Sequence, residues 1–235
     1  MKKIFKLFLV LIMVISLTAC GNASSTVETE ELAGGWTLKS DYSTTNISEE
    51  EQTMFEDAMN TYTGMLFEPI ALIGTQIVSG TNYMFLCKGI TVTSEPKSSL
   101  KVVIVYKDLE GTAKITKVSD FDVTNYVNQE NDNSSNVNLS GGWTTNVANY
   151  KNVLSDSDKT MFDNATIELT GVGYEPISVV ATQVVAGTNY AVLAYGTTVT
   201  SDPITSVYML TIYKDLSDNS SVTSINQIDL SDFNK

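Results

Sequence analysis

The chain of 235 residues contains no histidine, no arginine and only two cysteines. Histidine is the side chain most often used as a general base and as a metal ligand, so its absence argues against most hydrolases and metal sites. One cysteine lies in the N-terminal segment, which leaves Cys87 without a partner for an intramolecular disulfide. Lysines number 14 against 27 acidic residues, a net charge of −13, which disfavours nucleic acid and anionic lipid headgroups as partners.

The first residues have the pattern of a secretory signal, in which lysines precede the short apolar run Phe8–Leu17. This run is too short for a stable membrane span. The sequence Leu17-Thr18-Ala19-Cys20 resembles a bacterial lipobox, which implies cleavage before Cys20 and diacylglycerol on its sulfur. We therefore expect a signal peptide over 1–19 and a polar stalk over 20–31. The protein would be held on the extracytoplasmic face of the cell membrane by its lipid alone. An ordinary signal peptide with an incidental cysteine is the alternative.

An internal duplication fills the remainder of the chain. Trp36 and Trp143 are separated by 143 − 36 = 107 positions, and the same offset pairs the two copies throughout without a gap. We expect repeats over 32–127 and 139–235, joined by a polar linker over 128–138. Each repeat is about 95 residues long, near the size of a domain with its own core.

Within each repeat the pattern changes from helix to strand. Ser48 followed by Glu51 predicts a capping box, and Ser155 begins the equivalent segment of the second copy. Apolar residues at helical spacing follow, including Met54 and Phe55. After this helix, runs rich in β-branched residues separated by turn residues predict four antiparallel strands.

A second repeated motif lies at the predicted turn between the first two of these strands. Gln76–Gly80 and Gln183–Gly187 both fit Gln-x-Val-x-Gly, and Thr-Asn-Tyr follows in each copy. Near the start of the repeats, Leu32–Gly35 and Leu139–Gly142 share the pattern Leu-x-Gly-Gly. Glycine at the end of the pentapeptide permits positive φ, so the hairpin can close tightly.

These motifs and the order of elements resemble the cystatins, reversible inhibitors of papain-like cysteine proteases. The resemblance implies an α+β fold of two tandem cystatin-like domains, each with one helix packed on a four- to five-stranded antiparallel sheet. In that family the glycine-containing N-terminal trunk and the first hairpin enter the protease cleft. The protease-binding residues that it implies here are Gly34, Gly35, Gln76, Ile77, Val78, Ser79, Gly80, Gly141, Gly142, Gln183, Val184, Val185, Ala186 and Gly187.

The chain departs from the family at the second hairpin, where Pro-Trp is common. Asp108–Gly111 and Asp215–Asp218 stand at that place, which predicts an anionic turn. Repeat two is the closer match, and we expect Gly187 to be needed for the turn and Val185 for contact with the protease.

Two functions follow from this resemblance. The first is inhibition of a papain-like cysteine protease, and the alternative is a non-inhibitory cell-surface binding or adhesion module on the same scaffold. Catalysis is the third class, since carboxylate pairs can cleave glycosides without histidine. However, acidic residues that recur between the copies, such as Asp108 and Asp215, stand at predicted turns. We therefore expect a monomeric protein that is not an enzyme and needs neither a cofactor nor a metal.

The lipobox generates the first prediction. Cys20→Ala should remove the sulfur that carries the lipid, so the protein should be released to the medium or kept as its precursor. Labelling of cells with radioactive palmitate measures this. Equal incorporation by the wild type and by Cys20→Ala would overturn the lipoprotein interpretation.

Overall fold

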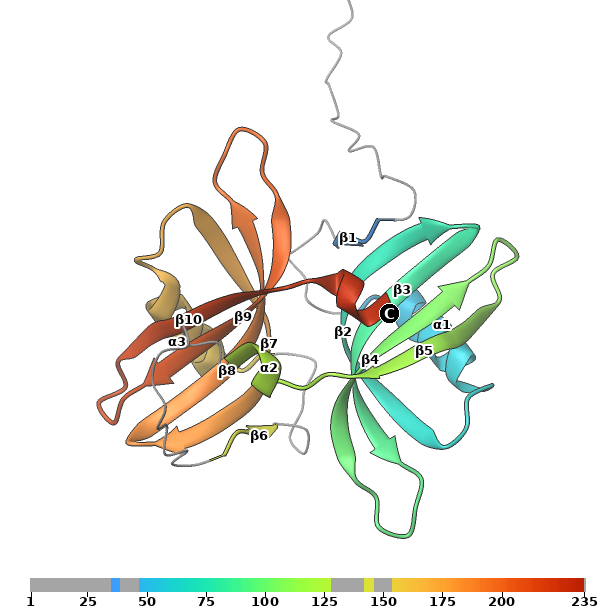
Figure 1. Ribbon diagram of the computed structural model, residues 1–235, viewed down its shortest axis with the longest axis horizontal. Coiled ribbons are helices and arrows are strands. Elements are labelled where there is room, and N and C mark those ends of the chain that lie inside the picture. Colours follow the sequence, from blue (N-terminus) through green and yellow to red (C-terminus); the bar gives the residue numbers. More distant parts are fainter. Residues whose placement is uncertain (1–34, 39–46, 128–141, 146–153, 235) are drawn as a thin grey trace, which may run out of the picture. The chain divides into compact units, whose positions relative to one another are not determined.

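The computed structural model describes residues 35–38, 47–127, 142–145 and 154–234, and Figure 1 shows their arrangement. The predicted signal peptide, stalk and linker, including Cys20, lie outside the described residues. So do Gly34 and Gly141.

Each repeat forms one five-stranded antiparallel sheet. In the first, the strands lie in the order β1-β2-β3-β4-β5, and in the second in the order β10-β9-β8-β7-β6. The elements of the first repeat are β1 (Thr37–Leu38), α1 (Glu49–Met59), β2 (Met65–Val78), β3 (Gly80–Thr91), β4 (Ser98–Lys107), β5 (Ala113–Asp120) and α2 (Thr124–Val127). Those of the second are β6 (Thr144–Thr145), α3 (Asp156–Thr166), β7 (Val172–Val185), β8 (Gly187–Thr198), β9 (Thr205–Lys214), β10 (Ser220–Ile228) and the 3-10 helix η2 (Leu230–Asn234).

The long helix of each repeat begins where the sequence predicts. Before α1 the capping box is present: the Ser48 amide donates to the Glu51 carboxylate at 2.8 Å, and the Glu51 amide donates to the Ser48 hydroxyl. Helix α1 buries Phe55 against one face of its sheet, where the ring meets Phe85 edge-on at a centroid distance of 5.0 Å. Helix α3 buries Phe162 in the same way.

The central strands are buried on both faces. Met84–Cys87 and Val102–Val105 are continuous buried runs rather than alternating ones. Phe85 and its same-face neighbours pack under α1, whereas Leu86 belongs to a second cluster on the other face. A sheet with two apolar faces must be covered on both, because either face left in water would expose a large apolar area.

The second faces of the two sheets meet in one core. This shared core contains Leu86 of the first repeat together with Leu193 and Met209 of the second. A hydrogen bond also joins the repeats inside it, because the Tyr195 hydroxyl donates to the Leu72 carbonyl at 3.0 Å. The core of each repeat is therefore completed by the other repeat.

The C-terminal segments of both repeats take part in this packing. Helix α2 contacts β9 and β10 of the other repeat, and the Asn226 side-chain amide donates to the Tyr126 carbonyl at 2.7 Å. Phe233 of η2 stacks on Phe121 at a centroid distance of 6.0 Å. Leu230, in the same 3-10 helix, lies against Gly74 of β2. A methyl group added at Gly74 would be 3.3 Å from the Leu230 side chain.

The predicted fold class, α+β with two tandem cystatin-like domains, is wrong. Over the residues that the structure describes it is mostly β: two five-stranded antiparallel sheets make up most of it, and the helices are short. A domain with one helix on a sheet needs only one apolar sheet face. Here both faces are apolar, and the second is buried in the core that the repeats share.

The shared core generates the second prediction. Phe233→Ala should lower the free energy of unfolding by roughly 3–5 kcal/mol, because it removes a buried aromatic ring and leaves a cavity. The unfolding of both repeats should remain one transition in urea, with a lower midpoint. Asn234→Ala, at an exposed neighbouring position, is the control and should leave the midpoint unchanged. Two separate transitions, of which only one responds to Phe233→Ala, would contradict this description.

Candidate functional site

The Gln-x-Val-x-Gly motif forms the tight turn between the first two long strands of each sheet. In the first repeat, β2 pairs with β3 up to Val78 and Gly80, so Ser79 alone forms the tip. Gly80 and Gly187 have φ values of +137° and +129°, in the region that favours glycine. A Cβ atom on Gly80 would lie 2.5 Å from the Lys107 carbonyl oxygen, and one on Gly187 would collide with that of Lys214. Both glycines are therefore required by the turn itself.

Side-chain hydrogen bonds hold both turns rigid. The Asn82 amide donates to the Gln76 side-chain oxygen at 2.7 Å across the first hairpin. The Tyr106 hydroxyl donates to the Ser79 carbonyl at 2.6 Å. The second repeat has the same two bonds, from Asn189 to Gln183 at 2.8 Å and from Tyr213 to the Ala186 carbonyl at 2.5 Å. The Gln, Gly and Asn of the motif thus have structural roles in the hairpin.

A second turn lies beside the first in each sheet. Because Thr81 pairs with Lys107, the β4–β5 turn leaves the sheet at the same end as the β2–β3 turn. Asp108 does not face outward as an anionic tip, because its carboxylate accepts the Glu110 and Thr112 amides at 3.0 and 2.8 Å. The residue at the tip is Leu109, which is 88% exposed.

The equivalent turn of repeat two has the same construction. The Asp215 carboxylate accepts hydrogen bonds from the side chain and backbone of Asn219 and from the Ser217 amide. These bonds hold the pKa of Asp215 below its usual value, and the bond from the Asn219 side chain has the largest effect. Leu216 is then left 87% exposed at the tip.

The N-terminal trunk reaches the same end of each sheet. Thr37 pairs with Thr75 and Thr144 with Thr182, so the residues before β1 and β6 run toward the hairpin tips. Gly35 and Gly142 are exposed on these segments. The structure therefore brings the described trunk glycines close to the Gln-x-Val-x-Gly hairpins.

Each tip presents apolar side chains to solvent beside charged ones, since Glu110 and Asp218 are also exposed. We use the name turn edge for Ile77, Val78 and Leu109 in repeat one, and for Val184 and Leu216 in repeat two. Val184 is 73% exposed, whereas Val185, the valine expected to make contact, is half-buried. Sequence reasoning missed the two leucines, although their recurrence at the 107-residue offset within polar turns was a usable signal.

The described residues include neither a reactive thiol nor a cluster of metal ligands. Burial raises the pKa of the Cys87 thiol well above its usual value, which keeps it protonated and unreactive. Among the residues that the structure describes, no group of three or more acidic or cysteine side chains is placed to hold a metal ion. The turn edges are suited to contact with another molecule by burial of apolar side chains.

Comparison with known proteins identifies no family. No family model matches the chain, and no curated protein matches it. A solved structure described as an "Ntf2 like protein involved in plasmid conjugation" is 10% identical. The match covers 77% of this chain and 85% of that chain, with a TM-score of 0.21. A likeness at this level carries no inference about fold or function.

The turn geometry generates the third prediction. Gly187→Ala should destabilise the protein by about 1–3 kcal/mol, because alanine is strained at positive φ and its Cβ meets the Lys214 carbonyl. Gly142→Ala is the matched control, since no atom lies within 4 Å of its added Cβ. Thermal or urea unfolding measures both variants. Equal midpoints for the two would show that the hairpin tolerates a side chain at Gly187.

Proposed function

We propose that this chain is a protein-binding module on the extracytoplasmic face of the cell membrane, held there by its lipid, and that it is not an enzyme. The observation that carries this proposal is the turn edge. Exposed apolar residues stand at equivalent tips in both repeats, on turns braced by hydrogen bonds. Lone exposed apolar residues are common, but their recurrence on rigid turns is a specific feature.

Binding at these edges would be driven by burial of the leucines. Covering Leu109 or Leu216 against a partner contributes on the order of 2 kcal/mol each from apolar area. The hydrogen bonds to the Asp108 and Asp215 carboxylates hold the leucine-bearing turns in one conformation, so little entropy is lost when a partner binds. Two edges on one chain also allow bivalent binding, which raises the apparent affinity for a partner that has two sites.

The charge of the chain favours a certain class of partner. With a net charge of −13, it should associate fastest with a protein whose apolar groove is surrounded by basic residues. The location is supported by the signal-like segment and the lipobox of the sequence. No helix among the described residues is long and apolar enough to cross a membrane.

Inhibition of a papain-like cysteine protease is the second candidate. It is favoured by the juxtaposition of Gly35, the Gln76–Gly80 hairpin and the β4–β5 turn at one end of the first sheet. A rigid hairpin without a cleavable extended segment would occupy a protease cleft and resist hydrolysis. The apolar Leu109 stands at the tip of the second turn.

The fourth prediction tests the turn edges. The double variant Leu109→Asp/Leu216→Asp should bind its protein partner at least tenfold more weakly, because a charge replaces the apolar contact. Val92→Asp/Ile167→Asp changes two residues that are also exposed, 62% and 80%, but lie outside the turn edges. This control should retain the wild-type affinity.

The measurement has two arms. In the first, immobilised mature protein is exposed to the secreted and surface proteins of the producing cell, and retained proteins are identified and titrated against each variant. In the second, papain is titrated with the same variants. Micromolar inhibition that the Leu109/Leu216 double variant loses would favour the inhibitor. A partner that binds both double variants equally, or hydrolysis of a substrate by the protein itself, would overturn the proposal.

A further inference from the structure

The outer strand of the second sheet, β10, has one side without a partner strand. It stands at the end of the strand order β10-β9-β8-β7-β6, so it pairs with β9 alone in the part of the chain that the structure describes. Helices α2 and α3 contact β10, but each also contacts β9, so they cover the faces of the sheet and not its outer edge. An edge strand presents backbone N–H and C=O groups with which a further strand can pair.

The other sheet edges carry features that oppose such pairing. The edge strand of the first repeat, β5, contains Lys114, Lys117 and Asp120, and charged residues on an edge hinder the addition of a strand. At the opposite edges, β1 and β6 are only two residues long. Next to them, β2 and β7 contain Pro69 and Pro176, each beside a break in the strand register. Proline lacks the N–H group that a partner strand needs.

Strand β10 contains neither a charged residue nor a proline along Ser220–Ile228. At the 107-residue offset, the three charged residues of β5 are replaced by Ser221, Ser224 and Gln227. The two edges are built from the same repeat, yet only the edge at β10 has lost its charges. The edge at β10 is therefore the one suited to receive a further strand.

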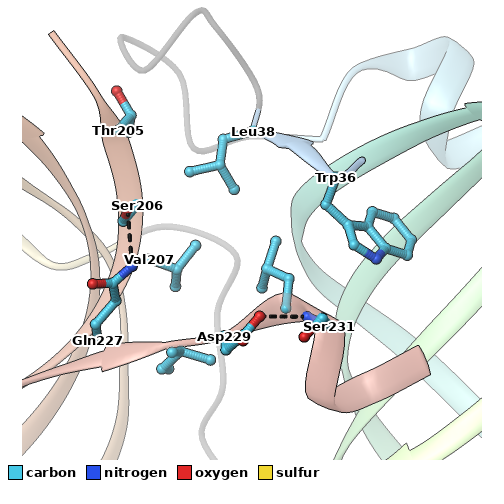
Figure 2. A pocket seen from close by; sticks show the side chains of 10 residues that line it. Trp36, Leu38, Thr205, Ser206, Val207, Gln227, Asp229 and Ser231 are labelled. Carbon is cyan, nitrogen blue, oxygen red and sulfur yellow. Dashed lines mark hydrogen bonds between the residues drawn. The ribbon is translucent and has the colours of Figure 1, made fainter. Parts of the chain in front are cut away.

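The C-terminal half of β10 is the regular part of this edge. Its register with β9 shifts once, before Ser224, and is unbroken from there to Ile228. Within this part the Ile225 side chain is 37% exposed. At its end lies a cavity of about 590 Å³, whose lining includes Gln227 and Ile228 together with Trp36 of repeat one (Figure 2). This end of β10 therefore borders open space.

Both ends of β10 are acidic. Asp215 and Asp218 precede the strand, and Lys214, which pairs with Asp218 at 2.8 Å, offsets one of these charges. Asp229 and Asp232 follow the strand and are exposed. Pairing with β10 of a second copy would join acidic ends in two chains that each carry a net charge of −13, which like-charge repulsion disfavours. A segment with lysine or arginine at its ends would be attracted.

We propose that β10 binds an extended segment of another protein by strand addition. The segment is rich in β-branched residues, carries no charge in its middle and has lysine or arginine at its ends. Backbone hydrogen bonds to the open edge supply the affinity, and a β-branched side chain beside Ile225 adds apolar contact. This interaction uses the backbone of one strand and does not rest on the turn edges, so it goes beyond the proposed function.

The fifth prediction uses a synthetic peptide as the probe. The acetylated and amidated peptide Lys-Thr-Val-Thr-Ile-Thr-Val-Thr-Lys is titrated into isotope-labelled mature protein, and amide shifts and hydrogen exchange are recorded by NMR. Binding should saturate with a midpoint below about 1 mM. The outward amides of β10 should exchange at least tenfold more slowly in the complex, because they become hydrogen-bonded to the peptide. The equivalent edge strand β5 is the internal control and should keep its exchange rates.

Modified peptides separate strand pairing from simple charge attraction. Two analogues carry N-methyl groups on the even-numbered or on the odd-numbered residues. Since successive N–H groups of a strand point to opposite sides, the analogue methylated on the paired side should bind at least tenfold more weakly. Its charges and side chains are unchanged. A peptide with glutamate in place of both lysines should also bind more weakly, because the ends of β10 are acidic.

A matched pair of variants locates the site on the protein. Ile225→Lys places a cation in the middle of β10 and removes the apolar contact, so it should weaken peptide binding at least tenfold. Ile167→Lys makes the same change outside the strand, at a residue that is 80% exposed, and should bind like the wild type. Thermal unfolding verifies that both variants are folded, and the peptide analogues test the pairing without any variant.

Any of four results would overturn the proposal. These are no saturable binding up to about 3 mM peptide, equal binding by the peptide and both N-methylated analogues, protection of β5 in place of β10, and a dimer in sedimentation velocity that Ile225→Lys dissociates. The last result would make a second copy the occupant. The Leu109→Asp/Leu216→Asp variant should bind the peptide like the wild type, so failure here and failure of the turn-edge proposal are distinguishable.

Discussion

Burial of the second face of each sheet is the interaction on which the rest of the structure depends. Helices α1 and α3 cover only the first faces, and the opposite faces, with Leu86, Leu193 and Met209, are covered by one another and by the C-terminal segments. Each C-terminal segment then packs against the other repeat, as Phe233 does on Phe121. The cavity beside Trp36 also depends on this arrangement, since its walls come from both repeats.

Much of the local structure could be predicted from the sequence, because short-range chemistry determines it. The capping box at Ser48 and Glu51 forms within one helical turn, and Gly80 takes the positive φ that its place in the turn requires. The fold class was wrong because covering the second face is a long-range event. The sequence did contain a signal that both sheet faces are buried, namely the unbroken apolar runs at Met84–Cys87 and Val102–Val105. In a strand with one face in water, polar residues would alternate with apolar ones.

The candidate site was predicted in part for the same reason. The repeated motif located the two hairpins, but it could not separate residues that build a turn from residues that face outward. Gln76, Asn82 and Gly80 build the turn, whereas Leu109 faces solvent from a neighbouring turn that the motif does not include. Nor could spacing along the chain reveal a cavity, because Trp36 and Asp229 meet only through the packing of distant segments.

The hydrogen bond from Tyr195 to Leu72 is made once, although the repeat that contains Tyr195 has a counterpart. The equivalent residue in repeat one is Lys88 (195 − 107 = 88), which instead pairs with Glu68 at 3.2 Å. Two copies of repeat two would have a tyrosine at both of these positions, and two copies of repeat one would have a lysine at both. This contact between the halves is therefore made by a residue that differs between the copies, so replacing one half by a second copy of the other would change it.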